Sequence, residues 1–229
     1  MRRRIFISVS LVLFASSLFG QTAKEQLNAI VRDTQKPGNR AGRITLIWWM
    51  PAEFWQAALS AGGTIPAAKA QEMVDTISDV NVVAVIDGKV GGFAQVDFVS
   101  QAELEKNLSA SDGQGKPLLI IPESKQSTAT KNLLAVMKPI TANMMGEFGK
   151  NFSFFVFEGK NKDGLRRVDP RKPGSLMLRL GGEEFRWRLP LGSLLREKIC
   201  PKCNETLPGN YVFCPFDGTP LKDQGGPKP

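Results

Sequence analysis

The sequence predicts an α+β fold, with a mixed or antiparallel sheet and helices packed on one face. Strand-like runs and helical stripes alternate irregularly, whereas a doubly wound parallel fold would need regular alternation. Two tight-turn signals, Asp87-Gly88 and Gly181-Gly182, predict antiparallel hairpins. The 229 residues are 42% hydrophobic, enough for one buried core. We therefore expect one main domain with a small C-terminal appendage.

Residues 1–20 have the pattern of a bacterial export signal. Three Arg residues precede an apolar run over 5–14, and small residues follow. The run is shorter than the roughly 20 residues of a spanning helix, so we expect cleavage rather than an uncleaved anchor. Removing three of the 30 basic residues leaves 27 against 22 acidic ones, a net charge of +5. The sequence thus predicts a periplasmic or extracellular protein that contacts the membrane only transiently, through this signal.

The first elements of the domain follow from apolar runs and their punctuation. Ile44–Met50 is a continuous apolar run of strand length. Pro51 suits the start of a helix over 52–61, and a second helix with an apolar stripe follows Pro66. Aromatic residues cluster at this junction as either a ligand platform or core packing, and we favour core packing. They are Trp48, Trp49, Phe54 and Trp55.

The middle of the domain begins with a hairpin. The β-branched run at 80–86, the turn at Asp87-Gly88 and a return strand at 90–99 predict it. Ser100 and Glu103 form a capping box that starts a short helix. The polar stretch 109–115 is predicted to be a loop.

The next segment contains the longest predicted helix. A short buried strand at 117–122 precedes this helix, whose apolar stripe over 128–148 should end at Gly149. An aromatic strand at 152–157 follows. The loop over 160–173 carries six basic and two acidic residues. Such a loop could touch an anionic partner, but we expect a solvated loop.

The last element of the domain is a hairpin around Gly181-Gly182. Apolar residues alternate with charged ones in both strands, so one face should cover a core and the other should meet solvent. The expected cross-strand pairs are Leu176 with Trp187, Leu178 with Phe185, and Arg179 with Glu184.

Residues 200–221 carry the clearest chemical signal. Cys200 and Cys203 have the same spacing as Cys214 and Asp217, and the two halves repeat each other. In each half Pro follows the first of these residues, and Asn or Gly, which tolerate left-handed backbone, follows the second. Two tight turns with two ligands each can supply the four ligands of a tetrahedral metal site.

This pattern resembles the zinc-ribbon family, in which two such knuckles bind one structural zinc ion. The resemblance covers about a tenth of the chain and implies that Cys200, Cys203 and Cys214 are ligands. Asp217 stands where the family usually has a fourth Cys. A carboxylate can bind zinc, although thiolate is commoner in structural sites. Asp217 therefore closes the site, or the site is weak, or it is a metal-free turn.

No catalytic or cofactor-binding residue is identified. The chain has no His, which excludes imidazole-based acid–base chemistry and His metal ligands. No phosphate-loop or G-x-S-x-G motif is present. We expect an exported, non-enzymatic protein whose zinc ribbon serves stability or protein interaction. One alternative is a periplasmic thiol/disulfide protein using the C-x-x-C pair, and another is a nucleic-acid-binding ribbon protein if the chain is not exported.

The expected organisation has five segments, and the sequence predicts no oligomeric state. They are a signal peptide at 1–20, a polar linker with a possible short helix at 21–43, the α+β domain at 44–195, the zinc-ribbon-like module at 196–222 and a disordered tail at 223–229.

Overall fold

The computed structural model describes residues 23–62 and 66–222. The predicted signal peptide at 1–20 and tail at 223–229 lie outside the described residues. Within the described part of the chain, no helix is both long and apolar enough to cross a membrane.

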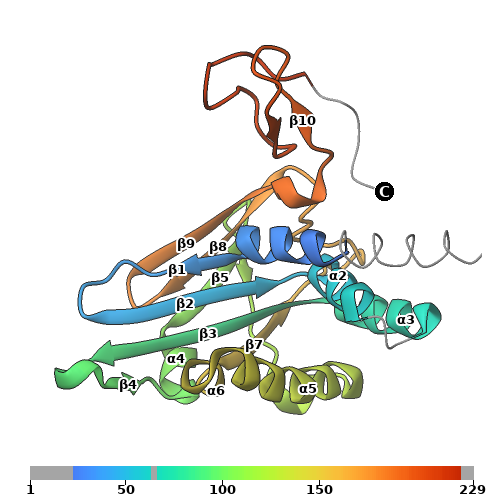
Figure 1. Ribbon diagram of the computed structural model, residues 1–229. Helices are drawn as coiled ribbons and strands as arrows, with labels where there is room; N and C mark the ends of the chain where they lie inside the picture. The colour runs from blue at the N-terminus through green and yellow to red at the C-terminus, as the bar shows by residue number, and fades with distance from the viewer. Residues whose placement is uncertain (1–22, 63–65, 223–229) are drawn as a thin grey trace, which may run out of the picture.

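The domain contains two sheets, and all of their strand pairs are antiparallel, which confirms the α+β prediction (Figure 1). The five-stranded sheet has β1 (Gln35–Pro37), β2 (Arg43–Met50), β3 (Val80–Val90) and β4 (Val96–Phe98) in order, with β7 (Ser153–Glu158) also paired to β3. The four-stranded sheet has the order β6 (Pro117–Leu118), β5 (Leu108–Asp112), β8 (Gly174–Leu180) and β9 (Glu183–Leu189).

Helices occupy the segments between these strands. The N-terminal helix covers residues 23–34. The others are α2 (Ala52–Gly62), α3 (Ala67–Ile77), α4 (Gln101–Asn107), α5 (Thr128–Met145) and α6 (Glu147–Lys150). The predicted helix start at Ser100 is confirmed, because the Ser100 Oγ accepts a hydrogen bond from the Glu103 N–H at the start of α4.

Alternate residues of β2 face two different layers. The Trp49 ring lies 6.1 Å from the ring of Trp187 in β9, and the Trp48 ring lies 5.1 Å from Phe54 in α2. The five-stranded sheet therefore lies between the four-stranded sheet and helix α2. All four clustered aromatic residues, including Trp55, are buried, which confirms core packing over a ligand platform.

The two sheets are joined along one edge by the chain around residues 119–121. The Ile121 N–H donates to the Val156 carbonyl at 2.7 Å, and the Glu158 N–H donates to the Leu119 carbonyl at 2.9 Å. At the opposite edge Trp187 Nε1 donates to the Thr34 carbonyl at 3.1 Å. The strands thus wrap around one continuous apolar interior.

The prediction of a polar linker at 21–43 is wrong for the described residues, although the short helix within it is confirmed. Ile30 is buried in the domain core, and residues 35–37 pair with β2 as strand β1. The carboxylate of Asp33 accepts a hydrogen bond from the Ser193 N–H at 2.8 Å. This segment forms part of the fold because its short apolar patch packs against the domain core and the Thr34 carbonyl accepts a hydrogen bond from Trp187, 153 residues away.

The predicted turn at Asp87-Gly88 is also wrong. Strand β3 continues through both residues, and the chain turns between Gly91 and Gln95, whose N–H and carbonyl groups are 2.7 Å apart. Asp87 remains in the strand because Thr45, directly opposite, donates to its carboxylate at 2.7 Å.

Two further predictions need correction. Residues 108–112 form strand β5 instead of part of a polar loop, because Leu108 and Ala110 point into the core and pair with β8. The long helix ends at Gly146, which has a φ of 59°, before the predicted stop at Gly149. Val136 in its predicted apolar stripe is exposed.

The hairpin around Gly181-Gly182 has the predicted register. The opposite pairs are Leu176 with Trp187, Leu178 with Phe185, and Arg179 with Glu184. The apolar members are buried, and Arg179 donates to Glu184 at 2.7 Å on the exposed face.

Candidate metal centre

The C-terminal module projects from one end of the domain (Figure 1). It contains a short ribbon of β10 (Lys198–Ile199) and β11 (Thr206–Leu207). Its own apolar cluster is separate from the domain core and consists of Cys200, Leu207, Cys214 and Leu221. We call residues 200–207 the first knuckle and 214–221 the second knuckle.

The two knuckles repeat the same hydrogen bonds. In the first, the Asn204 N–H donates to the Cys200 carbonyl at 3.0 Å, and in the second, the Gly218 N–H donates to the Cys214 carbonyl at 2.9 Å. Asn204 and Gly218 have φ values of 60° and 72°, the left-handed conformation that the sequence predicted for both.

The strand contacts around the knuckles repeat as well. Ile199 pairs with Thr206 beside the first knuckle, and Phe213 pairs with Pro220 beside the second. Ile199 precedes Phe213, and Thr206 precedes Pro220, by the same number of residues as Cys200 precedes Cys214. The module is therefore a structural repeat, which brings its two pairs of donor residues together.

The four predicted ligands meet at one place. The sulfurs of Cys200, Cys203 and Cys214 and a carboxylate oxygen of Asp217 all lie within 4.8 Å of one another. Cys203 and Cys214 have their sulfurs 3.6 Å apart, and the Cys200 sulfur lies 3.5 Å from Asp217 Oδ2. These three cysteines and one aspartate could hold a metal ion.

The spacing suits a tetrahedral ion with sulfur ligands. Zinc–sulfur bonds of about 2.3 Å place two sulfurs of a tetrahedron about 3.8 Å apart. A disulfide would need a sulfur–sulfur distance of about 2.05 Å, and all three thiols are free. Among the described residues, no other group of three or more Cys, Asp or Glu side chains has this arrangement.

The donors differ in how readily they carry negative charge. Burial raises the pKa of the Cys200 thiol, but hydrogen bonds from the backbone N–H groups of Cys203 and Lys202 lower it overall. Hydrogen bonds from Thr219 hold the pKa of Asp217 far below its usual range. The hydrogen bond from the Glu205 N–H lowers the pKa of Cys203. Desolvation and the neighbouring side chains of the cluster raise this pKa to about 12, and these side chains are Cys200, Cys214 and Asp217.

These pKa shifts have opposite signs because the side chains compete to carry negative charge within one cluster. A thiolate at Cys200 and a carboxylate at Asp217 make ionisation of a third neighbour unfavourable unless a cation is present. The Thr219 N–H also donates to Asp217 Oδ1 at 2.8 Å, which orients the carboxylate toward the sulfurs.

The module is packed directly against the domain. A Cβ atom on Gly209 would lie 2.4 Å from the Cβ of Leu195 and 2.3 Å from the Arg196 carbonyl oxygen. A Cβ atom on Gly192, in η3 (Gly192–Leu194), would lie 2.5 Å from Asn210 Oδ1. The two glycines permit this close approach.

Outside the module, buried carboxylates are paired with arginines. Glu53 binds Arg166, and Asp112 binds Arg167, at 2.8 and 2.6 Å. These arginines come from the basic loop at 160–173, so part of its charge is neutralised by the domain. These pairs could not be predicted from local sequence, because Glu53 and Arg166 are 113 residues apart.

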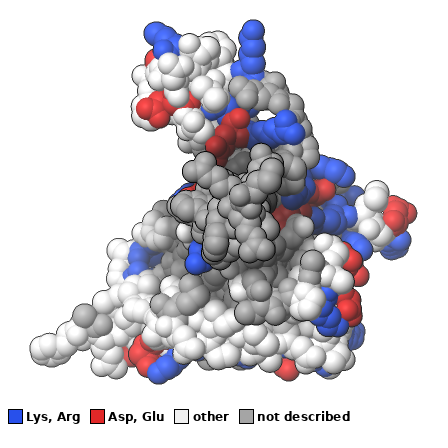
Figure 2. All heavy atoms as spheres, turned by 45° about the vertical axis from the view of Figure 1, so that its right-hand side comes forward, with Lys and Arg blue, Asp and Glu red and all other residues white. Residues whose placement is uncertain are grey.

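Space-filling representation shows basic and acidic side chains interleaved along the right-hand side of the molecule, rather than a field of one sign (Figure 2).

Comparison with known proteins found no matching family model, no matching curated protein and no matching solved structure.

Proposed function

We propose that this is an exported, non-enzymatic protein whose C-terminal module is a zinc ribbon that serves stability or protein interaction. The observation that carries the proposal is the meeting of Cys200, Cys203, Cys214 and Asp217 within 4.8 Å on two repeated turns. Export rests on the pattern of residues 1–20.

Zinc is the proposed ion because of the donor set. Thiolate ligands favour zinc over magnesium, calcium or manganese, and zinc accepts one oxygen ligand in a tetrahedral site. Four protein donors leave no open position for a substrate, as expected for a structural site. The four-residue apolar cluster of the module is small, so bound metal would supply most of its folding energy.

Metal analysis combined with thiol titration on purified residues 21–229 tests this proposal. We expect about one zinc per chain and three protected thiols. Absence of metal, together with one disulfide and one free thiol, would reject the zinc ribbon in favour of a thiol/disulfide protein.

Asp217→Cys tests the fourth ligand. Because thiolate is the softer donor, the substitution should tighten zinc binding if Asp217 is a ligand. Competition with a chromophoric zinc chelator measures the change. An unchanged affinity would remove Asp217 from the site while leaving the three cysteines in place.

A further inference from the structure

The module exposes an unusual concentration of large apolar side chains. Of the thirteen exposed large hydrophobic residues in the described chain, five lie in the module, which is about a tenth of the sequence. Their exposed fractions are 54% for Ile199, 40% for Tyr211, 63% for Val212, 59% for Phe213 and 72% for Phe216. Four of the five lie in or directly before the second knuckle.

The first knuckle is an internal control for this surface. Lys202 occupies the position that corresponds to Phe216, between the two metal-ligand positions, and is exposed. Glu197 likewise corresponds to Tyr211. The ribbon fold therefore accepts charged residues at both positions, so neither Tyr211 nor Phe216 is required for folding.

The exposed apolar area of the module is smaller than the area that a stable interface buries. An aromatic side chain contributes roughly 150–250 Å² when fully exposed. The five exposed fractions then sum to on the order of 500 Å² of apolar surface on the module, which we call the apolar patch. A stable interface buries about 800 Å² on each side, so a partner must also contact the neighbouring surface.

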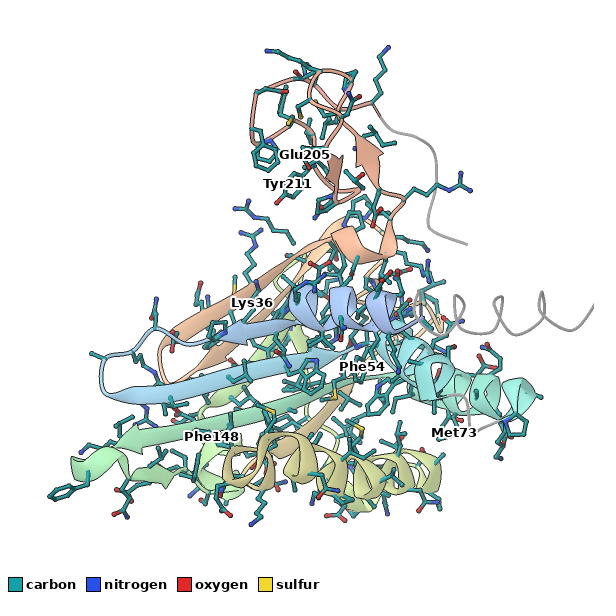
Figure 3. The ribbon with its side chains drawn as sticks, in the orientation of Figure 1. Lys36, Phe54, Met73, Phe148, Glu205 and Tyr211 are labelled. Atoms are coloured by element: carbon teal, nitrogen blue, oxygen red, sulfur yellow. The ribbon has the colours of Figure 1, made fainter. Side chains whose placement is uncertain are left out.

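A basic notch of about 410 Å³ lies beside this patch, between β9 and the module. Lys36, Arg186 and Arg188 line it, and Asn210, which precedes Tyr211, forms its wall on the module side. Figure 3 shows Lys36 on the domain side of the notch and Tyr211 on the module side. Asp33 is the one carboxylate among the lining residues, and it already accepts the Ser193 N–H.

We propose that the second knuckle and the basic notch together bind an acidic segment of another protein that carries aromatic or aliphatic side chains. The apolar side chains of the segment cover Phe213 and Phe216, and its carboxylates enter the notch. A second copy of this chain is the alternative occupant, and the test below distinguishes it. This inference rests on the proposed function and specifies the partner of the module.

Selection from a random peptide library on the purified, metal-loaded chain tests the proposal. We expect peptides rich in Asp and Glu beside Phe, Leu or Ile, with affinity measured by fluorescence anisotropy. Phe216→Lys and Arg188→Glu should each weaken binding about tenfold or more. Leu165→Lys, a matched change at an exposed position on the domain loop, should leave it unchanged.

Zinc content is measured on the same samples. Phe216→Lys copies the residue of the first knuckle, so its metal content should equal that of the wild type. Peptides without acidic residues, no enriched peptides, or equal binding by all variants would overturn the proposed partner. Concentration-dependent dimers in sedimentation that Phe216→Lys abolishes would overturn it in favour of a second copy. Loss of metal from the wild type would instead contradict the zinc ribbon.

Discussion

The domain and the C-terminal module are stabilised in different ways. One cluster of 35 buried apolar residues joins both sheets and the helices of the domain. The module has a cluster of four, and two of these are candidate metal ligands, Cys200 and Cys214. Apolar burial can therefore account for the domain, whereas the module buries few apolar side chains, and the proposed zinc ion would supply the missing stability. The two regions should respond differently to the same treatments.

Metal removal should produce the largest difference. Structural zinc in small modules has apparent binding free energies of about 10–16 kcal/mol, so a strong chelator should unfold residues 198–221. The domain should keep its protection, because its core is separate. Hydrogen exchange followed by mass spectrometry measures both regions. Unfolding of the whole chain at once, or an unchanged module, would contradict this division.

Trp49→Ala should produce the converse result. Trp49 is fully buried, contacts Trp187 and donates from Nε1 to Asn81 Oδ1 at 3.2 Å. Its removal should lower the free energy of unfolding of the domain by about 3–5 kcal/mol, measured by urea denaturation. Zinc content should not change. Val136→Ala, at an exposed position in α5, is the control and should change stability by less than about 0.5 kcal/mol.

Asp87→Asn tests the charged part of the domain. Burial raises the pKa of Asp87, but hydrogen bonds from Arg43 and Thr45 and the charge of Arg40 lower it overall. Because this buried carboxylate binds both arginines at 3.0 Å or less, its neutralisation should cost about 3 kcal/mol at neutral pH.

The pH dependence has a defined sign. A carboxylate whose folded-state pKa is lowered stabilises the protein above its unfolded value of about 3.9, and this contribution is lost as the pH falls through the folded value. The urea concentration at the midpoint of unfolding of the wild type should therefore decrease as the pH is lowered below about 4. The midpoint of Asp87→Asn should decrease less steeply over the same pH range. Parallel curves for the two proteins would show that Asp87 does not contribute.

Ser100→Ala should have the smallest effect. Loss of the cap on α4 should destabilise the domain by about 1 kcal/mol, measured as a shift in urea midpoint. Ser109→Ala, on the exposed face of β5, supplies the control without a cap. An equal shift in both variants would mean that the cap contributes nothing.

Prediction from sequence succeeded where the determining contacts are local. The hairpin over 176–189 and its register follow from a two-residue turn and alternating side chains. The arrangement of the knuckles is local too, because each supplies two donors from one tight turn. The pairing of Cys200 with Cys203, and of Cys214 with Asp217, could therefore be expected without knowledge of the domain.

Prediction failed where a distant partner decides the structure. The N-terminal helix is fixed by β9 and η3, far along the chain. Residues 109–112 form a strand because β8 lies beside them. Asp87-Gly88 has the composition of a turn, but Arg43 and Thr45 hold Asp87 within a strand. None of these partners can be inferred from local composition.

The close packing at Gly192 and Gly209 has a mechanical consequence. With Gly209 in contact with Leu195, the module cannot pivot relative to η3 unless this contact opens. The N–H of Ser193, the residue after Gly192, donates a hydrogen bond to the carboxylate of Asp33 in the N-terminal helix. A larger side chain at Gly192 or Gly209 would therefore displace the module from the end of the domain to which the N-terminal helix is hydrogen-bonded.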